Sequence, residues 1–310
     1  MMVPAPQKSN AAPVGVAESL RILLNGLIDY AGMFPPAGLS LADAARNFVR
    51  YAQGSRAWML GNLVVPAAQL GELRRCLHSL PEARGTQCGV SALLGAEPLR
   101  DAETIREALR QAESAGYLIK AVEFRPGSPA MLPEIAAALP SALPVFCEIS
   151  PAEDLGVWLV AIRQAGWSAK IRTGGTTPES FPSSASVARF LMQCNLQGVA
   201  FKATAGLHHP VRSEHPLTYE SKSVCGVMHG FLNVFLGAAL LESGIAEDRL
   251  VEVLDDTHAA SFRFTGRFAH WEKVSVNDED ISRTRRSFAL SFGSCSFEEP
   301  IRDLEKLGIL

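Results

Sequence analysis

Charged side chains stand inside short apolar segments of this 310-residue chain, where a charge is costly to keep. Two of them are amines, Lys170 and Lys202, and three are carboxylates, Asp29, Glu123 and Glu148. A buried charge costs free energy unless it is paired or used in chemistry. We therefore interpret this set as a reactive centre. The alternative is that these side chains point outward or form internal salt bridges.

The two lysines indicate a particular chemistry. A lysine has an ordinary pKa near 10.4, and a neighbouring cation together with partial desolvation lowers that pKa. Arg172 lies on the same face of its segment as Lys170, because side chains alternate along a strand, and Lys202 belongs to the next segment. A neutral amine attacks a carbonyl and forms a Schiff base. The three carboxylates can transfer protons during carbinolamine formation and carbon–carbon cleavage.

Adjacent histidines form a second group of reactive side chains. His208 and His209 lie in Gly206-Leu-His-His-Pro210, just beyond Lys202. Imidazoles and a carboxylate can bind a divalent metal, which would make the protein a metal-dependent lyase or hydrolase. Adjacent side chains of an extended segment point opposite ways, so a single ion bound by both is geometrically awkward. Substrate contact, acid–base catalysis and a plain loop role are the alternatives.

Two loops of small residues can hold an anion. They are Gly174-Gly-Thr-Thr177 and Gly293-Ser-Cys-Ser296, and each follows an expected strand. Backbone N–H groups with a helix N-terminus behind them bind phosphate or carboxylate, and a tight turn is the alternative. A helix N-terminus also lowers the pKa of a thiol. No histidine is close to Cys295 in the sequence, however, so we do not expect this thiol to be a nucleophile.

The segments that position these side chains alternate between strand and helix patterns. The strand-like runs start 24 to 31 residues apart, which is the length of a strand–helix unit with a parallel neighbour. We expect seven such strands, at residues 27–31, 58–65, 88–94, 119–124, 145–149, 169–173 and 199–204. Helical patterns fill the intervals, at 40–52, 101–115, 129–139, 153–165, 184–194 and 224–241.

An eighth strand would close these units into a (β/α)8 barrel. We place it at residues 288–292, and the alternative register places it at 261–265 and makes 278–291 helical. No GxGxxG motif follows a strand, which favours the barrel over an open dinucleotide-binding sheet. The carboxyl ends of barrel strands form the active-site face, so the charged side chains should converge there.

The domain organisation follows from this pattern. Residues 1–18 are expected to be a loose N-terminal tail, and residues 19–310 a single barrel domain. Residues 244–287 form an inserted or extra segment. It is expected to hold a helix at 246–257, a β-like stretch at 262–271 and a helix that begins near Asn277.

The composition excludes several classes of protein. Hydrophobic residues make up 47% of the chain and charged residues 20%, which excludes general disorder. The net charge of −3 provides no field for nucleic acid or an anionic membrane. No apolar run reaches the roughly 20 residues of a membrane span, and no signal peptide is recognised, so we expect a cytoplasmic protein. The six cysteines are unclustered and expected to be reduced. The expected partner is a small-molecule substrate, and a homo-oligomer stays open.

The order of the motifs resembles the deoxyribose-phosphate aldolase group of class I aldolases, which are aldolase-type TIM barrels. Lys170-Ile-Arg-Thr-Gly174 is similar to the strand that carries the family's Schiff-base lysine, and Lys202-Ala-Thr-Ala-Gly206 to the next strand, whose lysine perturbs the first. Ala121-Val-Glu123 resembles the strand with the relay aspartate, and Phe146-Cys-Glu148 the Ile-Glu-Thr strand. The segment around Asp29 resembles the opening Ile-Asp strand. Residues 293–296 are similar to the phosphate loop.

The resemblance implies a Schiff-base lyase that acts on a small carbonyl substrate, phosphorylated or not, without a cofactor. Its catalytic residues would be Lys170, Lys202, Glu123, Glu148 and Asp29. Its substrate-binding residues would be Arg172, Thr173, Gly174, Thr204, Gly206, His208, His209, Gly293, Ser294 and Ser296. Glutamate replaces the relay aspartate, and Ala205-Gly206 replaces Gly-Gly, so the substrate is not simply inherited. Besides the metal-dependent enzyme, the further alternative is a non-catalytic barrel that binds a small anion.

Overall fold

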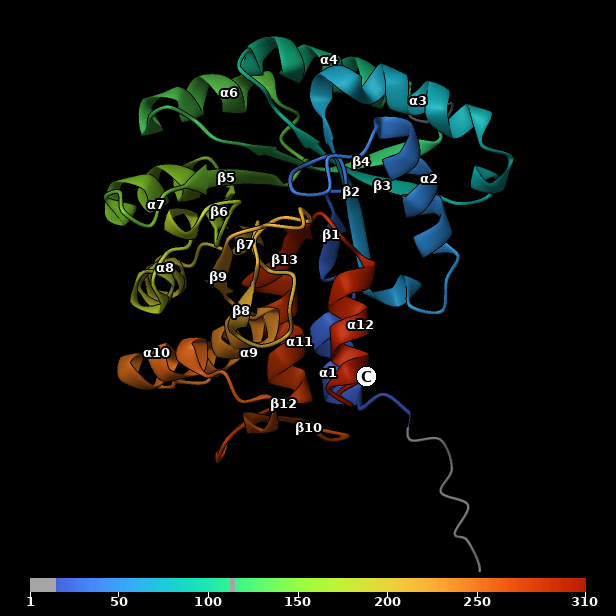
Figure 1. Cartoon of the computed structure of the whole chain (residues 1–310). Coiled ribbons are helices and arrows are strands. Elements are labelled where there is room, and N and C mark those ends of the chain that lie inside the picture. Colours follow the sequence, from blue (N-terminus) through green and yellow to red (C-terminus); the bar gives the residue numbers. More distant parts are fainter. Residues whose placement is uncertain (1–14, 112–114) are drawn as a thin grey trace, which may run out of the picture.

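Eight parallel strands close into a barrel in this computed structural model, which describes residues 15–111 and 115–310 (Figure 1). Their order around the barrel is β1-β13-β7-β6-β5-β4-β3-β2. The strands are β1 (Ile28–Tyr30), β2 (Leu60–Pro66), β3 (Cys88–Leu93), β4 (Tyr117–Phe124), β5 (Val145–Ile149), β6 (Ser168–Arg172), β7 (Phe201–Thr204) and β13 (Ala289–Ser294). The (β/α)8 class is therefore confirmed.

Helices cover the outside of the barrel. They are α1 (Glu18–Leu24), α2 (Leu41–Ala52), α3 (Leu70–Ser79), α4 (Pro98–Arg110), α6 (Leu132–Ala138), α7 (Leu155–Gln164), α8 (Ser184–Gln197), α9 (Phe231–Glu242), α10 (Glu247–Asp255), α11 (Asp278–Ser287) and α12 (Glu298–Lys306). Four of them begin at a side-chain cap, because Ser40, Asp154, Ser183 and Asn277 each accept a hydrogen bond from a backbone N–H of the first turn.

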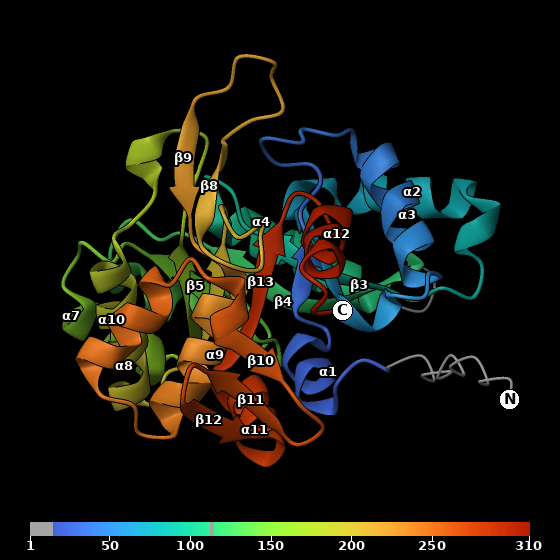
Figure 2. The same cartoon turned by 60° about the horizontal axis from the view of Figure 1, so that its bottom comes forward.

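The eighth strand lies where we placed it. β13 pairs with β1 and β7, which confirms the placement at 288–292 and excludes the one at 261–265. Residues 262–277 instead form a three-stranded antiparallel sheet of β10 (Phe262–Phe264), β11 (Phe268–Trp271) and β12 (Val274–Asn277). This sheet lies beside α1, and the Ser19 hydroxyl donates to the Thr265 and Phe268 carbonyls at 2.7 and 3.0 Å (Figure 2).

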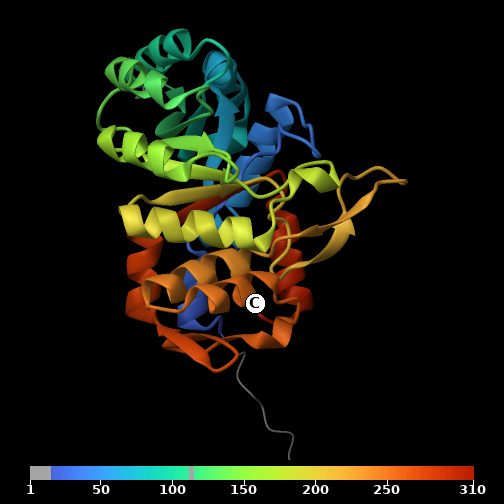
Figure 3. The ribbon, with the colours of Figure 1, turned by 90° about the vertical axis from the view of Figure 1, so that its left-hand side faces the viewer.

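The helix predicted at 224–241 is wrong in its first part. Cys225–Met228 is strand β9, which pairs with β8 (Ser213–Pro216) as an antiparallel hairpin, and helix α9 begins only after Gly230. Gly230 has extended backbone angles, and a Cβ there would lie 2.5 Å from the Pro210 carbonyl oxygen. The backbone is therefore not helical at this point, and the close approach of Pro210 leaves no room for a side chain there. The hairpin extends beyond the end of the barrel (Figure 3).

The expected N-terminal tail, residues 1–18, is only partly covered by the described residues. Residues 1–14 of the expected tail lie outside the described residues, and helix α1 begins at Glu18, within that predicted range. The predicted helix at 101–115 begins earlier, at Pro98, and is described as far as Arg110. Within residues 15–111 and 115–310, we find no helix with the length and apolar character needed to span a bilayer.

Helix α9 is buried on nearly all sides and packs against the outer face of the barrel. Phe231 and Phe235 place their rings 5.3 and 5.8 Å from that of Phe292 on β13. One polar side chain is enclosed in this helix. The Asn233 amide is fully buried and donates to the carbonyls of Val253 and Asp256 at 2.7 and 2.8 Å. It thus ties α9 to the end of α10.

We expect Asn233→Ala to lower the free energy of unfolding by about 2 to 3 kcal/mol, because it leaves buried carbonyl groups without a donor. The matched control is Asn195→Ala, which removes an exposed amide from α8. Urea unfolding of both variants measures the difference. Equal stability of the two variants would contradict this role for Asn233.

Candidate active site

The strand register places three of the five charged residues in one row across the barrel. Glu148 on β5 is opposite Lys170 on β6, Lys170 is opposite Lys202 on β7, and Lys202 is opposite Ser291 on β13. Side chains at paired positions of parallel strands point to the same side. A second row lies two residues further along, where Arg172 is opposite Thr204 and Thr204 is opposite Gly293.

The five predicted catalytic residues form one ion network. The Lys202 Nζ lies 2.5 Å from Asp29 Oδ2 and 2.6 Å from Glu123 Oε1. The Lys170 Nζ lies 2.9 Å from Glu123 Oε2 and 2.9 Å from Glu148 Oε2. Glu123 therefore bridges the two lysines. None of the five side chains is more than a tenth exposed, so they converge inside the barrel, and they do so through the internal salt bridges that were the alternative to a reactive centre.

Neutral groups complete the network and were missed in the sequence. The Ser91 hydroxyl donates to Glu123 Oε1 at 2.6 Å, and the Ser291 hydroxyl donates to Asp29 Oδ2 at 2.8 Å. The backbone N–H of Asn62 donates to Asp29 Oδ1 at 2.5 Å, and a side chain at Gly61 would collide with that oxygen. A serine in the middle of an apolar strand was the available signal for Ser91 and Ser291.

The network determines which groups are charged. Burial raises the pKa of Glu123, but the charges of Lys170 and Lys202 outweigh it and hold this pKa well below its usual range. Burial likewise raises the pKa of Glu148. The charges of Lys170 and Arg172 outweigh this effect, so the pKa of Glu148 is lowered overall. For Lys202, burial lowers the pKa, and Asp29 and Glu123 more than reverse this. Lys202 therefore stays protonated at neutral pH.

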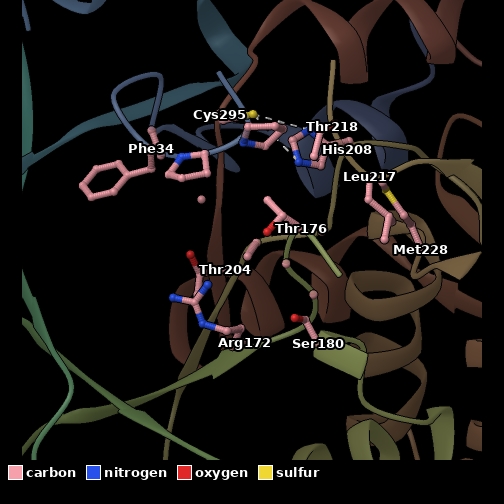
Figure 4. A pocket seen from close by; sticks show the side chains of 18 of the residues that line it. Phe34, Arg172, Thr176, Ser180, Thr204, His208, Leu217, Thr218, Met228 and Cys295 are labelled. Atoms are coloured by element: carbon pink, nitrogen blue, oxygen red, sulfur yellow. Dashed lines mark hydrogen bonds between the residues drawn. The ribbon is translucent and has the colours of Figure 1, made fainter. Parts of the chain in front are cut away.

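A cavity of about 360 Å³ opens above the network. Glu123 and Lys170 are part of its lining, and Lys202 is not. The aromatic and aliphatic wall comprises Phe34, Pro35, Pro36, Leu217 and Met228, of which the last two come from the β8–β9 hairpin. In Figure 4 the Arg172 guanidinium extends toward Thr204 at the edge of the cavity. Of the two lysines, only Lys170 is therefore placed to meet a bound molecule.

Most of the predicted substrate-binding residues line this cavity. They are Arg172, Gly174, Thr204, Gly206, His208, His209 and Gly293. Gly174 and Gly206 belong to loops that touch, because a Cβ on Gly174 would lie 2.9 Å from Cα of Gly206. Ala205, which links the end of β7 to Gly206, has a φ of 60°, a conformation that favours glycine.

Three predicted binding residues, Thr173, Ser294 and Ser296, do not line the cavity. Their hydroxyls form hydrogen bonds with backbone groups of the loops instead. The Thr173 hydroxyl donates to the Ala205 carbonyl at 2.6 Å. The Ser294 hydroxyl accepts from the Ser296 N–H at 3.3 Å, and the Ser296 hydroxyl accepts from the Glu299 N–H at 3.1 Å. The 293–296 loop thus uses its polar groups to begin α12.

The two histidines contact separate carboxylates of α12. His208 Nδ1 lies 3.0 Å from Glu299 Oε2, and His209 Nδ1 lies 2.6 Å from Asp303 Oδ2. Within the described residues, no group of three or more His, Cys, Asp or Glu side chains is arranged to hold a metal ion. The geometry therefore does not favour the metal alternative on His208 and His209.

Cys295 has a histidine neighbour in space, although none is close to it in the sequence. Its sulfur is 4.0 Å from both ring nitrogens of His208 and 3.6 Å from the Tyr219 hydroxyl, because the ends of β7 and β13 are neighbours. Burial lowers the pKa of His208, but Cys295 and Glu299 raise it overall, to about 9. Burial lowers the pKa of His215, beside His209, to about 4. The wall of the cavity therefore holds one imidazolium, at His208.

Comparison with solved structures gives similarity at low sequence identity. The carboxyl transferase domain of Rhizobium etli pyruvate carboxylase is 13% identical with a TM-score of 0.39. That match covers 66% of this chain and 42% of the other. A dihydrodipicolinate synthase family protein from Coccidioides immitis is 16% identical with a TM-score of 0.38, covering 74% and 76%.

The spore cortex-lytic enzyme SleL of Bacillus cereus is 13% identical with a TM-score of 0.39, covering 91% of this chain and 73% of the other. No family model and no curated protein matches the sequence. With TM-scores below 0.5, these likenesses carry no statement about activity. The fold class rests on the closed barrel itself.

We expect Lys202→Met to lower the free energy of unfolding by about 3 to 5 kcal/mol, because it leaves Asp29 without a cationic partner inside the barrel. Lys170→Met should lower the free energy of unfolding clearly less, because Glu123 keeps its ion pair with Lys202 and Glu148 keeps its ion pair with Arg172. Urea unfolding of the two variants under one buffer tests this order. A larger loss for Lys170→Met would contradict it.

The raised pKa of His208 predicts a loss of stability in alkaline solution. Its protonated form stabilises the fold fully below the ordinary pKa of about 6.5, and this contribution is lost as the pH rises to about 9. We expect the free energy of unfolding to fall by up to about 3 kcal/mol over this range, and His208→Gln to remove most of the slope. The exposed His78→Gln is the control. A wild-type stability that stays level from pH 6.5 to 9 would refute the assignment.

Proposed function

We propose that this protein is a Schiff-base lyase of the class I aldolase kind, which cleaves a carbon–carbon bond in a small carbonyl compound. Lys170 is the nucleophile. The observation that carries the proposal is the position of its amine, which lies between Glu123 and Glu148 at the floor of the cavity. Lys202 is enclosed below and held as a cation, so it is not the attacking amine.

Formation of the Schiff base uses the carboxylates beside Lys170. The Lys170 ammonium passes one proton to Glu123 or Glu148, and the neutral amine attacks the carbonyl carbon. A proton moves from nitrogen to oxygen and gives the carbinolamine. The carboxylic acid then protonates the hydroxyl, which leaves as water, and an iminium remains on Lys170. While Lys170 is neutral, the residue that remains a carboxylate keeps a cationic partner, because Glu123 contacts Lys202 and Glu148 contacts Arg172.

Cleavage requires a hydroxyl group on the carbon two positions from the iminium carbon. A carboxylate removes the hydroxyl proton, the carbon–carbon bond breaks, and its electron pair enters the iminium to form an enamine. An aldehyde is released, and protonation and hydrolysis of the enamine return free Lys170. Glu123 is the carboxylate best placed for this step, because it lines the cavity and contacts Lys170.

Trapping with borohydride tests the proposal. We expect incubation with plain and phosphorylated aldehydes and ketones, followed by reduction, to leave a stable mass increase on the peptide that contains Lys170. Lys170→Met should abolish the adduct and any turnover while the protein stays folded. Lys120→Met, which removes an exposed lysine from β4, is the matched control and should keep both.

Three results would overturn the proposal. An adduct on Lys202 would move the nucleophile to the other lysine. No adduct with any carbonyl, or full turnover by Lys170→Met, would remove the Schiff-base mechanism and leave the metal-dependent enzyme and the non-catalytic anion-binding barrel as the alternatives.

A further inference from the structure

A second cavity, of about 280 Å³, adjoins the first at the carboxyl ends of β4, β5 and β6. Its polar lining includes Arg125, Glu148, Ser150, Arg172, Glu179 and Ser180. Arg172 and Ser180 also line the larger cavity that contains Lys170, so the two spaces share a border. Figure 4 shows both side chains on the same side of the larger cavity.

Two guanidinium groups in this second cavity have unused donors. Among the residues that the structure describes, Arg125 forms no hydrogen bond or ion pair. Arg172 donates through Nε to Glu148 Oε1 at 3.2 Å, and its terminal nitrogens have no partner in the same part of the chain. Because a guanidinium carries five N–H donors in a planar fork, both groups are suited to an oxyanion.

The two carboxylates that line the second cavity, Glu148 and Glu179, differ in whether they are paired with a cation. Glu148 is already paired with Lys170 and Arg172. Glu179 is exposed on the rim and forms no ion pair with a described residue, so it would repel an anion held nearby. Removal of the Glu179 charge should therefore strengthen the binding of an anion by Arg125, whereas removal of the Arg125 charge should weaken it.

The expected phosphate loop is a poorer place for an anion. Residue Glu299, which follows the 293–296 loop, places its carboxylate against His208 and the Tyr219 hydroxyl and lines the main cavity. A protein carboxylate thus already lies on this side of the cavity, and it would repel a phosphate held there. An anionic group of the substrate is better held on the opposite side, at Arg172.

The ion pairs place Arg172 near the proposed reacting amine. Lys170 and Arg172 lie on the same face of β6 and contact the same carboxylate, with Lys170 Nζ 2.9 Å from Glu148 Oε2 and Arg172 Nε 3.2 Å from Glu148 Oε1. An anion held by Arg172 would therefore lie close to a carbonyl that meets Lys170, on the side where the second cavity opens.

We propose that the second cavity is an anion subsite, in which Arg125 and Arg172 hold a terminal carboxylate or phosphate of the substrate while its carbonyl meets Lys170. The substrate class is an aldehyde or ketone that carries an oxyanion. The role in catalysis rests on the proposed function, whereas the binding of an anion by the two arginines does not.

The first test compares charged and uncharged carbonyl probes by borohydride trapping at Lys170. The pairs are glyceraldehyde with glyceraldehyde 3-phosphate, and butanal with succinic semialdehyde. For wild type, half-maximal trapping at Lys170 should need a lower concentration of the charged probe than of its uncharged partner. Arg125→Gln should reduce this preference about tenfold, and Glu179→Gln should increase it. The pair with the larger preference distinguishes phosphate from carboxylate.

Arg100→Gln is the matched control, because Arg100 is an exposed arginine on α4 that lines neither cavity. It should leave the preference unchanged. The proposal is wrong if Arg125→Gln changes charged and uncharged probes by the same factor, or if neither Arg125→Gln nor Glu179→Gln changes the preference.

The second test does not depend on Schiff-base chemistry. In Lys170→Met, phenylglyoxal modifies arginines, and peptide mass spectrometry reports the rate at each one. Inorganic phosphate or succinate should slow modification of Arg125 and Arg172 but not of Arg100. Protection without any trapping in wild type would keep the subsite and reject the proposed lyase. Trapping at Lys170 without protection would keep the lyase and reject the subsite.

Discussion

The site depends on the carboxylate of Glu123, whose two oxygens each contact a different lysine. A lysine pair inside a barrel would repel, and each ammonium would lose its hydration; the shared carboxylate offsets both costs. Ser91 supports the bridging carboxylate from the neighbouring strand, and Asp29 provides the second counter-charge for Lys202. With Glu123 in place, the two amines can occupy adjacent positions on β6 and β7.

This arrangement divides the barrel interior into two levels. The lower level, with Lys202 and Asp29, is closed from the cavity and fully satisfied by ion pairs and by hydrogen bonds from Ser291 and Asn62. The upper level, with Lys170, faces the cavity, and each of its two carboxylate partners also contacts a second cation. This division of the interior supports Lys170 over Lys202 as the nucleophile of the Schiff-base mechanism that we propose.

The rim of the cavity is shaped by helix α12 and the β8–β9 hairpin. Glu299 and Asp303 of α12 hold the two histidines on separate carboxylates, and Tyr219 of the hairpin contacts Glu299 and Cys295. A protein carboxylate at the start of α12 takes the position where barrels often bind phosphate. In our proposal, an anionic group of the substrate is recognised instead by Arg125 and Arg172, at the ends of β4 and β6.

The sequence alone determined the repeat of strands and helices, and with it the barrel, because a parallel neighbour requires a unit of about 30 residues. It also determined the five charged residues of the network, because a charge inside an apolar strand costs free energy unless it is paired or used in chemistry. It did not determine the β8–β9 hairpin, which replaced the start of a predicted helix once Gly230 ended the helical path. Only the tertiary structure decided that Lys170 and not Lys202 faces the cavity, that His208 lies beside Cys295, and that Arg125 and Arg172 border one space. These facts depend on the stagger and pairing of strands distant in sequence, which no local pattern records.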